Sequence, residues 1–299
     1  MLSLAPLRYR HAMDPQTGPI SKVETFTLPV LDRNLFHANA FLRPDLKRRS
    51  RSLSVYGSAD GSGTHESAAV ARHMAISESL ERWAFLEVSK SSEHVSFGFD
   101  VDPSSNGMAA FPGLGSSPAR RAAWMEAIER HCLIGWWQGS VGSTRRPSPW
   151  NNIHAIEFLH GFDGVSVVLL IQESEPDLIV YGHAAGESFE AACNRAIVEL
   201  ARSELVIRRF HALHPGPVES HLSAVTDLFE RRCLFFSTAE GFRAAISRGR
   251  QFVRHWHRPR VVFDGEIRGP WSEFTTVWRV VLEPPTMEFL QKRDDWFFW

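Results

Sequence analysis

Two copies of a Glu-x-x-Glu-Arg pattern contain the residues whose types and spacing are best suited to catalysis or to binding a charged ligand. The copies comprise Glu78, Glu81 and Arg82, then Glu126, Glu129 and Arg130. Glutamates three positions apart lie on one face of a helix, and an arginine four positions after the first glutamate can reach back to it. Two such faces brought together would gather four carboxylates and two guanidiniums, a set that suits Mg²⁺ and phosphate.

A structural role for the same residues is the main alternative. Each copy could form a salt-bridged helix facing solvent, although the surrounding Ala, Trp, Phe, Leu and Ile residues argue against a fully solvated face. A third helical pattern carries Arg195 and Glu199 at i,i+4 spacing, where an ion pair is the default interpretation. Three acid-bearing helices together favour a polyanionic ligand held through Mg²⁺, which prefers carboxylate oxygens, water and phosphates.

Weaker candidates accompany these patterns. Gly57, Gly61 and Gly63 precede a helix and could approach a phosphate closely, or they could form a plain connector. The pair His255-x-His257 has no carboxylate or cysteine at ligand spacing, which disfavours a metal site. Cys132 is better interpreted as a small buried thiol than as a nucleophile.

Three long helices are expected to position the charged residues. They span about residues 65–88, 118–137 and 188–210, with Thr64 as N-cap and Glu66 in the first turn of the first helix. A Glu-Pro-Asp turn within 164–186 predicts a β-hairpin. Other segments are expected to form a strand with loops over 1–50, a loop with one short strand over 92–117, a loop over 212–224, a weaker helix near 238–249, and strands near 259–264 and 275–282.

These elements predict an α+β protein in which long helices pack on sheets and carry the acidic site, within a single domain over residues 1–299. The aromatic end at 296–299 could pack on the body or meet a partner. The net charge of -1 offers no general attraction to nucleic acid or anionic lipid. No apolar stretch approaches the roughly 20 residues that span a bilayer. Three widely spaced cysteines indicate a reduced compartment, so we expect a cytoplasmic protein.

Taken together, the sequence resembles the YcaO family, ATP-dependent proteins that activate backbone amides in peptides. The resemblance is strongest over residues 52–286. It rests on GSGTHESAAVARHMAISESLERWAF, ARRAAWMEAIERHCLIGWW, GHAAGESFEAACNRAIVELARSEL and a closing VWRVVLEPPT segment.

The resemblance implies a site in which helix-borne glutamates hold Mg²⁺ and the phosphates of ATP. The metal ligands would be Glu78, Glu81, Glu126 and Glu129. Arg82 and Arg130 would brace the helices, Arg195 would face the phosphates, and Glu199 would complete the cofactor-binding set. In azoline-forming members a Cys, Ser or Thr side chain of the substrate attacks the preceding amide carbonyl. The oxyanion then takes the γ-phosphoryl group of ATP, and loss of phosphate leaves the ring, whereas other members use sulfide to make a thioamide.

The sequence departs from the family pattern at several positions. Met74 stands where the family usually has serine, and Leu114, Pro118 and Ala122 stand where it usually has a polar Asn, Glu and Gln series. His131 replaces an expected aspartate. These departures bear on both cofactors, ATP and Mg²⁺, because Leu114, Pro118 and Ala122 cannot coordinate a metal or bind a nucleobase.

Three hypotheses follow from the resemblance and its departures. The first is an ATP-dependent cyclodehydratase-like or thioamide-forming enzyme acting on a ribosomally made peptide natural product such as an antibiotic. The second is a YcaO-like scaffold or peptide-binding subunit that no longer binds ATP, and the third is a divergent metal-dependent hydrolase. We expect a precursor peptide as substrate and, because residues 1–50 leave little room for a leader-binding domain, a separate leader-recognition subunit. Self-association is left open, and no nucleic-acid or membrane partner is expected.

Overall fold

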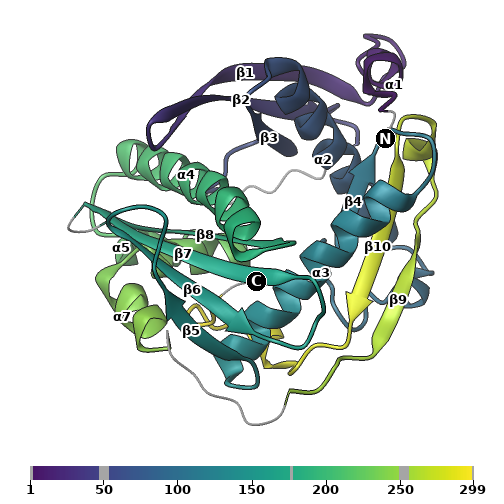
Figure 1. Ribbon diagram of the computed structural model, residues 1–299. Helices are drawn as coiled ribbons and strands as arrows, with labels where there is room; N and C mark the ends of the chain where they lie inside the picture. Colours follow the sequence, from purple (N-terminus) through teal and green to yellow (C-terminus); the bar gives the residue numbers. More distant parts are fainter. Residues whose placement is uncertain (1–2, 47–53, 176–177, 249–255, 298–299) are drawn as a thin grey trace. The chain divides into compact units, whose positions relative to one another are not determined.

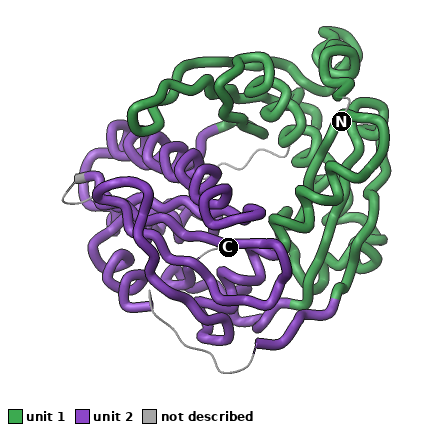
Figure 2. The backbone as a smooth tube through the Cα atoms, viewed as in Figure 1, with its two compact units in different colours: residues 1–50, 58–127, 261–283 green, residues 51–57, 128–260, 284–299 purple. Residues whose placement is uncertain are grey.

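The chain is divided between two compact units in the structure, a computed structural model that describes residues 3–46, 54–175, 178–248 and 256–297. Each unit is assembled from three separate stretches of sequence (Figure 2). Unit 1 comprises residues 1–50, 58–127 and 261–283, and unit 2 comprises residues 51–57, 128–260 and 284–299. Helices and sheets build both units, as the α+β prediction requires. The expectation of a single domain stays a prediction.

The first sheet of unit 1 is antiparallel, in the order β1-β2-β3. Its strands are β1 (Ile20–Val30), β2 (Arg33–Leu42) and β3 (Gly61–His65), and helix α2 (Ala68–Val88) packs against it (Figure 1). A short helix, α1 (Ala5–Ala12), lies beside α2. The sequence analysis expected one strand and loops over residues 1–50, and α1 and the second strand were missed.

Two glycines let β3 approach α2 closely. A Cβ atom at Gly61 would stand 2.3 Å from the backbone nitrogen of Ser79, and one at Gly63 would stand 2.3 Å from the carbonyl oxygen of Ala71. Backbone packing thus accounts for these two glycines. Thr64 was wrongly expected to cap the helix, because it lies in β3 and the N-cap is Ser67. Glu66 accordingly precedes the helix, and the first turn of α2 contains no acidic residue.

The second sheet of unit 1 has the antiparallel order β4-β10-β9. Its strands are β4 (Met108–Phe111), β10 (Thr276–Leu282) and β9 (Val261–Glu266), with short 3-10 turns at η1 (His94–Phe97) and η2 (Pro270–Glu273). The helix α3 (Ser117–Gln138) contributes residues 117–127 to this unit and its remaining residues to unit 2. Arg120 on α3 pairs with Asp264 on β9 at 2.6 Å, which attaches the start of the helix to the sheet.

Unit 2 is built around a four-stranded antiparallel sheet in the order β5-β6-β7-β8. Its strands are β5 (Gly142–Arg146), β6 (Ile153–Leu159), β7 (Ser166–Glu175) and β8 (Leu178–Gly186). The predicted hairpin is confirmed as the β7–β8 pair. Helix α4 (Phe189–Leu213) packs on β8 and β7 (Figure 1). The remaining elements are α5 (Glu219–Leu222), α6 (Leu228–Phe236), α7 (Ala239–Ser247) and η3 (Glu288–Leu290).

An aromatic cluster forms the core of unit 2 and includes the end of the described chain. Phe297 is fully buried and lies 4.6 Å from Phe236 and 5.3 Å from Trp136, measured between ring centroids. Tyr181 and Trp137 pack on the same ring. For Trp296 and Phe297, the alternative left open for the aromatic end is therefore settled in favour of packing on the body, while residues 298–299 lie outside the described residues. Within the described residues, no helix combines the length and hydropathy needed to cross a membrane.

Candidate functional site

Three of the glutamates predicted as ligands influence one another in unit 1. Glu78 and Glu81 lie on α2, and Glu126 lies on α3. The carboxylate of Glu78 accepts hydrogen bonds from the backbone nitrogen of Ser62 at 3.1 Å and from its hydroxyl at 3.4 Å. Strand β3 therefore orients Glu78, a contribution of Ser62 that the sequence analysis missed.

The pKa of Glu81 shows the effect of the neighbouring carboxylates most clearly. Burial raises the pKa of Glu81 well above its usual value, and the nearby charges of Glu126 and Glu78 raise it further. Arg82 and Arg279 act in the opposite direction but do not cancel the rise. The two helices thus bring together acidic side chains that are 45 or more residues apart in the sequence, which we call the unit 1 carboxylate cluster (Glu78, Glu81 and Glu126).

Glu129 has a different environment, in unit 2. Its Oε1 atom lies 2.5 Å from Nδ1 of His183 on β8, and its Oε2 atom accepts a hydrogen bond from the backbone nitrogen of Ala185 at 2.9 Å. Burial acts to raise the pKa of Glu129, but His183, Arg195 and the Ala185 amide outweigh burial and hold this pKa below its usual value. Glu129 is therefore a carboxylate stabilised in its charged form by protein groups.

The predicted residues of α4 have protein partners as well. Arg195 donates to the carbonyl oxygen of Ala185 at 2.9 Å. Glu199 is exposed and pairs with Arg202 at 2.7 Å, an i,i+3 contact. The default interpretation of the sequence, an Arg195–Glu199 pair, is thus replaced by a separate partner for each residue. Arg195 and Glu129 meet the same residue, Ala185, through its carbonyl and its amide respectively.

The two arginines predicted to brace the helices differ in burial. Arg82 is exposed on α2, close enough to Glu81 to act on its pKa. Arg130 is buried, with its guanidinium 5.0 Å from the ring centroid of Phe289. Arg130 thus packs against the C-terminal stretch of unit 2 through a cation–π contact.

The positions that depart from the YcaO pattern provide no polar side chain. Met74 and Leu114 are exposed, Pro118 lies in the first turn of α3, and Ala122 is exposed on the same helix. His131 is buried and packs edge-on against Phe162. Within the described residues, no group of three or more His, Cys, Asp or Glu side chains is placed to hold a metal ion.

The remaining candidates are now easier to assign. Cys132 is fully buried, and burial together with the charge of Glu129 raises the pKa of its thiol well above the usual value, so it is an inert core thiol. Cys132 is thus the small buried thiol that the sequence favoured. His257 is exposed, and His255 lies outside the described residues.

His183 is the site residue that sequence reasoning did not identify. It lies 54 positions from Glu129, on a strand that is otherwise small and apolar around it, Gly182 to Gly186. The sequence signal that could have identified it is a histidine within a small, apolar strand, because a partly buried imidazole needs a polar partner.

No protein-family model and no curated protein matches the sequence. Solved structures do match in three dimensions. The YcaO protein from Methanopyrus kandleri, solved with AMPPCP and Mg²⁺ bound, aligns with a TM-score of 0.58 and 14% identity over 98% of this chain and 93% of its own. The microcin synthetase McbBCD complex of E. coli aligns with a TM-score of 0.53 and 13% identity, covering 86% of each chain. The same complex with pro-MccB17 bound gives 0.53 and 11% identity over equal shares.

The agreement extends over nearly the whole chain, whereas the sequence identities are low. Such likeness establishes the architecture rather than the activity. The two sheets of unit 1, the four-stranded sheet of unit 2 and the long helices α2, α3 and α4 together give this chain a YcaO-like fold.

Proposed function

We propose that this protein is an ATP-dependent enzyme that activates backbone amides of a ribosomally made peptide. The fold supports the proposal, since one structure with this fold contains AMPPCP and Mg²⁺ and another contains the peptide pro-MccB17. Azoline or thioamide formation would be the outcome, with loss of the amide oxygen as phosphate. ATP would supply the phosphoryl group that converts this oxygen into a leaving group.

The observation that carries the proposal is that Glu78, Glu81 and Glu126 lie close enough for their charges to act on one another. Burial raises the pKa of Glu81 most, and the charges of Glu126 and Glu78 raise it further, so a divalent cation would offset both the lost solvation and the repulsion. Glu78, Glu81 and Glu126 are therefore the residues proposed to hold Mg²⁺. Among the described residues no three such side chains are placed to hold a metal ion together, so one or two of these glutamates would bind Mg²⁺ along with waters and phosphate oxygens of ATP.

Ser62 and Arg82 would orient the metal-binding carboxylate and the phosphates rather than form or break bonds themselves. Ser62 holds Glu78 by two hydrogen bonds, so this carboxylate is oriented before any ligand arrives. Arg82 is exposed beside Glu81, and its guanidinium is proposed to meet phosphate oxygens. Positioning and charge neutralisation of this kind are the main requirements of phosphoryl transfer.

Calorimetric titration with Mg²⁺-ATP tests the proposal on the whole chain. Wild-type protein should bind, and Glu81→Gln should bind about tenfold or more weakly, because a charged metal ligand is lost. Glu87→Gln is the matched control, an exposed glutamate on the same helix that should bind like wild type. Absence of measurable heat with wild-type protein, or equal binding by Glu81→Gln, would contradict the proposal.

A second candidate function is a YcaO-like scaffold that binds a peptide or a partner without ATP. The specific observation in its favour is that Glu129 is already engaged by His183 and the Ala185 amide. The apolar residues Met74, Leu114 and Ala122 support the same candidate. It requires that Mg²⁺-ATP give no heat with wild-type protein while assembly with partners persists.

Partner proteins follow from both candidates. We propose a precursor peptide as substrate and a separate subunit that recognises its leader, since the E. coli structures with this fold are of a synthetase complex. Co-expression with genes adjacent to this one, followed by affinity purification through this chain, tests the second subunit. If this chain is recovered alone and the peptide is still modified, a separate leader-recognition subunit is not required.

A further inference from the structure

Two histidines of unit 2 pack against one aromatic ring at the end of helix α4. His214 is the C-cap of α4, and His221 lies in α5. Phe210 is buried, and its ring centroid lies 4.8 Å from that of His214 and 5.8 Å from that of His221. Both histidines are partly buried, so their contacts with Phe210 hold two imidazoles side by side.

The separation of the two imidazoles suits a shared metal ion. Their ring centroids lie 6.0 Å apart. Because a zinc–nitrogen bond is about 2.0–2.1 Å long, two imidazoles that bind one Zn²⁺ have ring centroids about 5–6 Å apart. The observed separation lies within this range, so one cation can reach both rings.

His221 has a ring nitrogen that the protein leaves unused. Nε2 of His221 is shielded from solvent and, among the described residues, has no hydrogen-bond partner. A Cβ atom at Gly216 would stand 3.8 Å from this nitrogen, so Nε2 faces the loop that connects the two histidines. Buried polar atoms are nearly always paired in native proteins, and a neutral imidazole nitrogen without a partner is a ready metal ligand.

The backbone around the pair favours a cation. Helix α4 is 25 residues long, and the negative end of its dipole lies at its C-terminus, beside His214. Pro215 and Pro217 restrict the loop between the two histidines, which reduces the conformational freedom lost when both side chains bind one ion. The pair is therefore largely oriented before a metal arrives.

From these observations we infer that His214 and His221 bind Zn²⁺ or a similar imidazole-preferring cation, with water completing the coordination. Imidazole suits Zn²⁺, Cu²⁺ and Ni²⁺, whereas Mg²⁺ prefers carboxylate and phosphate oxygens. His211 also contacts Phe210, at 6.5 Å between ring centroids, but among the described residues no three His, Cys, Asp or Glu side chains are placed to hold a metal ion together. The site therefore has two protein ligands, and the bound cation would join α5 to the end of α4.

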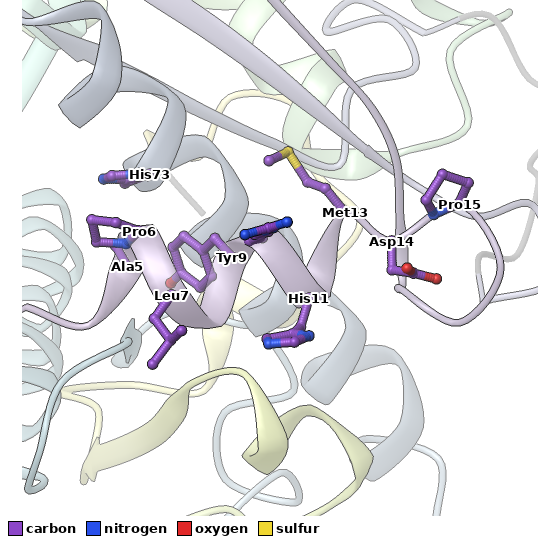
Figure 3. Close-up of a pocket in the computed structure, with 10 residues that line it drawn as sticks. Ala5, Pro6, Leu7, Tyr9, His11, Met13, Asp14, Pro15 and His73 are labelled. Atoms are coloured by element: carbon purple, nitrogen blue, oxygen red, sulfur yellow. The ribbon is translucent and has the colours of Figure 1, made fainter.

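The histidines that line a cavity beside α1 do not form a comparable pair. This cavity of about 750 Å³ lies in unit 1, and its lining includes His11 and His73. The two side chains lie on opposite sides of α1 (Figure 3), so one cation cannot contact both. The lining also balances Arg10 against the carboxylate of Asp14, and it favours neither a cation nor an anion.

Calorimetric titration of the whole chain with ZnCl₂, in the absence of ATP, tests the inference separately from the proposed function. Wild-type protein should bind Zn²⁺, and an excess of Mg²⁺ should leave this binding unchanged, because Mg²⁺ takes oxygen ligands. Zn²⁺ binding in unit 2 can be present while Mg²⁺-ATP binding at the unit 1 carboxylate cluster is absent, and the reverse. Failure of one proposal is therefore distinguishable from failure of the other.

Variants locate the bound ion. His214→Ala and His221→Ala should each bind Zn²⁺ at least about tenfold more weakly, because loss of a group that merely supports a metal ligand already costs about 10–100-fold in affinity. His154→Ala removes an exposed histidine from the same unit and should bind like wild type. Far-UV circular dichroism without metal shows whether each variant is folded.

Pulsed electron paramagnetic resonance of wild-type protein with one equivalent of Cu²⁺ needs no variant. Two imidazoles should couple to the bound ion. No Zn²⁺ binding by wild-type protein, wild-type affinity in either His214→Ala or His221→Ala, or coupling to a single imidazole would overturn the inference. Competition by Mg²⁺ would overturn it in favour of a site with oxygen ligands.

Discussion

Glu129 and His183 are joined through Oε1 and Nδ1 at 2.5 Å, and the side chains are 15% and 19% exposed respectively. The contact joins α3 to β8 inside unit 2. The carboxylate also accepts from the Ala185 amide, so both of these hydrogen bonds come from strand β8. A glutamate that the sequence suggested as a metal ligand thus has a clear role in fixing a helix to a sheet.

His183→Ala should destabilise the protein by about 1.5–3 kcal/mol, the contribution typical of a hydrogen bond to a charged group. The imidazole is removed while the largely buried carboxylate of Glu129 remains. Urea unfolding monitored by tryptophan fluorescence measures the change. His257→Ala, an exposed histidine of the same unit, is the control and should stay within about 0.5 kcal/mol of wild type. Equal stability of His183→Ala and wild type would contradict a structural role for the contact.

The same contact predicts a pH dependence. Because the pKa of Glu129 is lowered in the folded protein, its contribution to stability is present above the unfolded pKa of about 4.3 and is lost as pH falls through the folded pKa. Wild-type protein should therefore lose stability below about pH 4.3. Glu129→Gln should show a shallower loss in the same range, measured by urea unfolding at a series of pH values. Parallel pH profiles for the two proteins would refute this assignment.

Glu81 predicts a pH dependence of stability opposite in sign to that of Glu129. Its pKa is raised in the folded protein, so its contribution to stability is complete below the unfolded pKa of about 4.3 and declines as pH rises toward the folded pKa. Without ligand, Glu81→Gln should be more stable than wild type at pH 7 and no more stable at pH 4. Each pKa unit of elevation corresponds to about 1.4 kcal/mol.

Addition of Mg²⁺-ATP should reverse this order, because the ligand stabilises wild-type protein more than Glu81→Gln. Thermal unfolding with and without Mg²⁺-ATP measures both effects. A variant that is less stable than wild type at pH 7 without ligand would show that the carboxylate is stabilised by the fold. In that case the carboxylate cluster would need no divalent cation to offset its charge.

Phe297 should contribute strongly to the stability of unit 2. Its ring is fully buried among Trp136, Trp137 and Phe236, and Phe297→Ala should cost about 3–5 kcal/mol. Leu213→Ala removes a side chain that is 63% exposed and should change stability by less than about 0.5 kcal/mol. Urea unfolding compares the two. A small effect of Phe297→Ala would mean that the end of the chain is not part of the core.

Arg232 should hold the C-terminal stretch by hydrogen bonds rather than by apolar contact. Its buried guanidinium donates to the carbonyl oxygens of Phe289, Gln291 and Arg293 at 2.9–3.0 Å. Arg232→Ala leaves these acceptors without their donor, and trypsin should then cut within residues 284–297 at least about tenfold faster, since losing such bonds costs more than about 1.4 kcal/mol. Arg243→Ala, on α7, is the control. Unchanged cleavage would show that aromatic packing alone retains the segment.

Strong local signals explain why part of the fold could be predicted from the sequence. The helices α2, α3 and α4 are long and uninterrupted, and the β7–β8 pair flanks a Glu-Pro-Asp sequence, so propensity and periodicity sufficed. Strands β5 and β6 were missed because charged residues such as Arg146 and Glu157 interrupt their apolar pattern and pair across the sheet at 2.6 Å. Helix α6 was missed although Asp227 caps it by accepting from the Glu230 amide.

The sequence predicted which residue types form the site but not which side chains contact one another. Glu78 and Glu81 share a helix, so their proximity followed from spacing alone. The approach of Glu126 depends on how α2 and α3 pack in unit 1, and the link between Glu129 and His183 depends on β8 lying beside α3. Neither relationship is local in sequence, and periodicity carries no information about it.

The interleaved path of the chain has a practical consequence for dissecting this protein. A fragment that stops at residue 127 would carry β4 without β10, the strand to which it is hydrogen-bonded, and would lack β9 as well. Unit 2 likewise needs the final stretch, because Phe297 completes its aromatic core. Chimeras and truncations should therefore exchange whole chains or discontinuous segments together, since no single cut yields a half that contains all of its own interior.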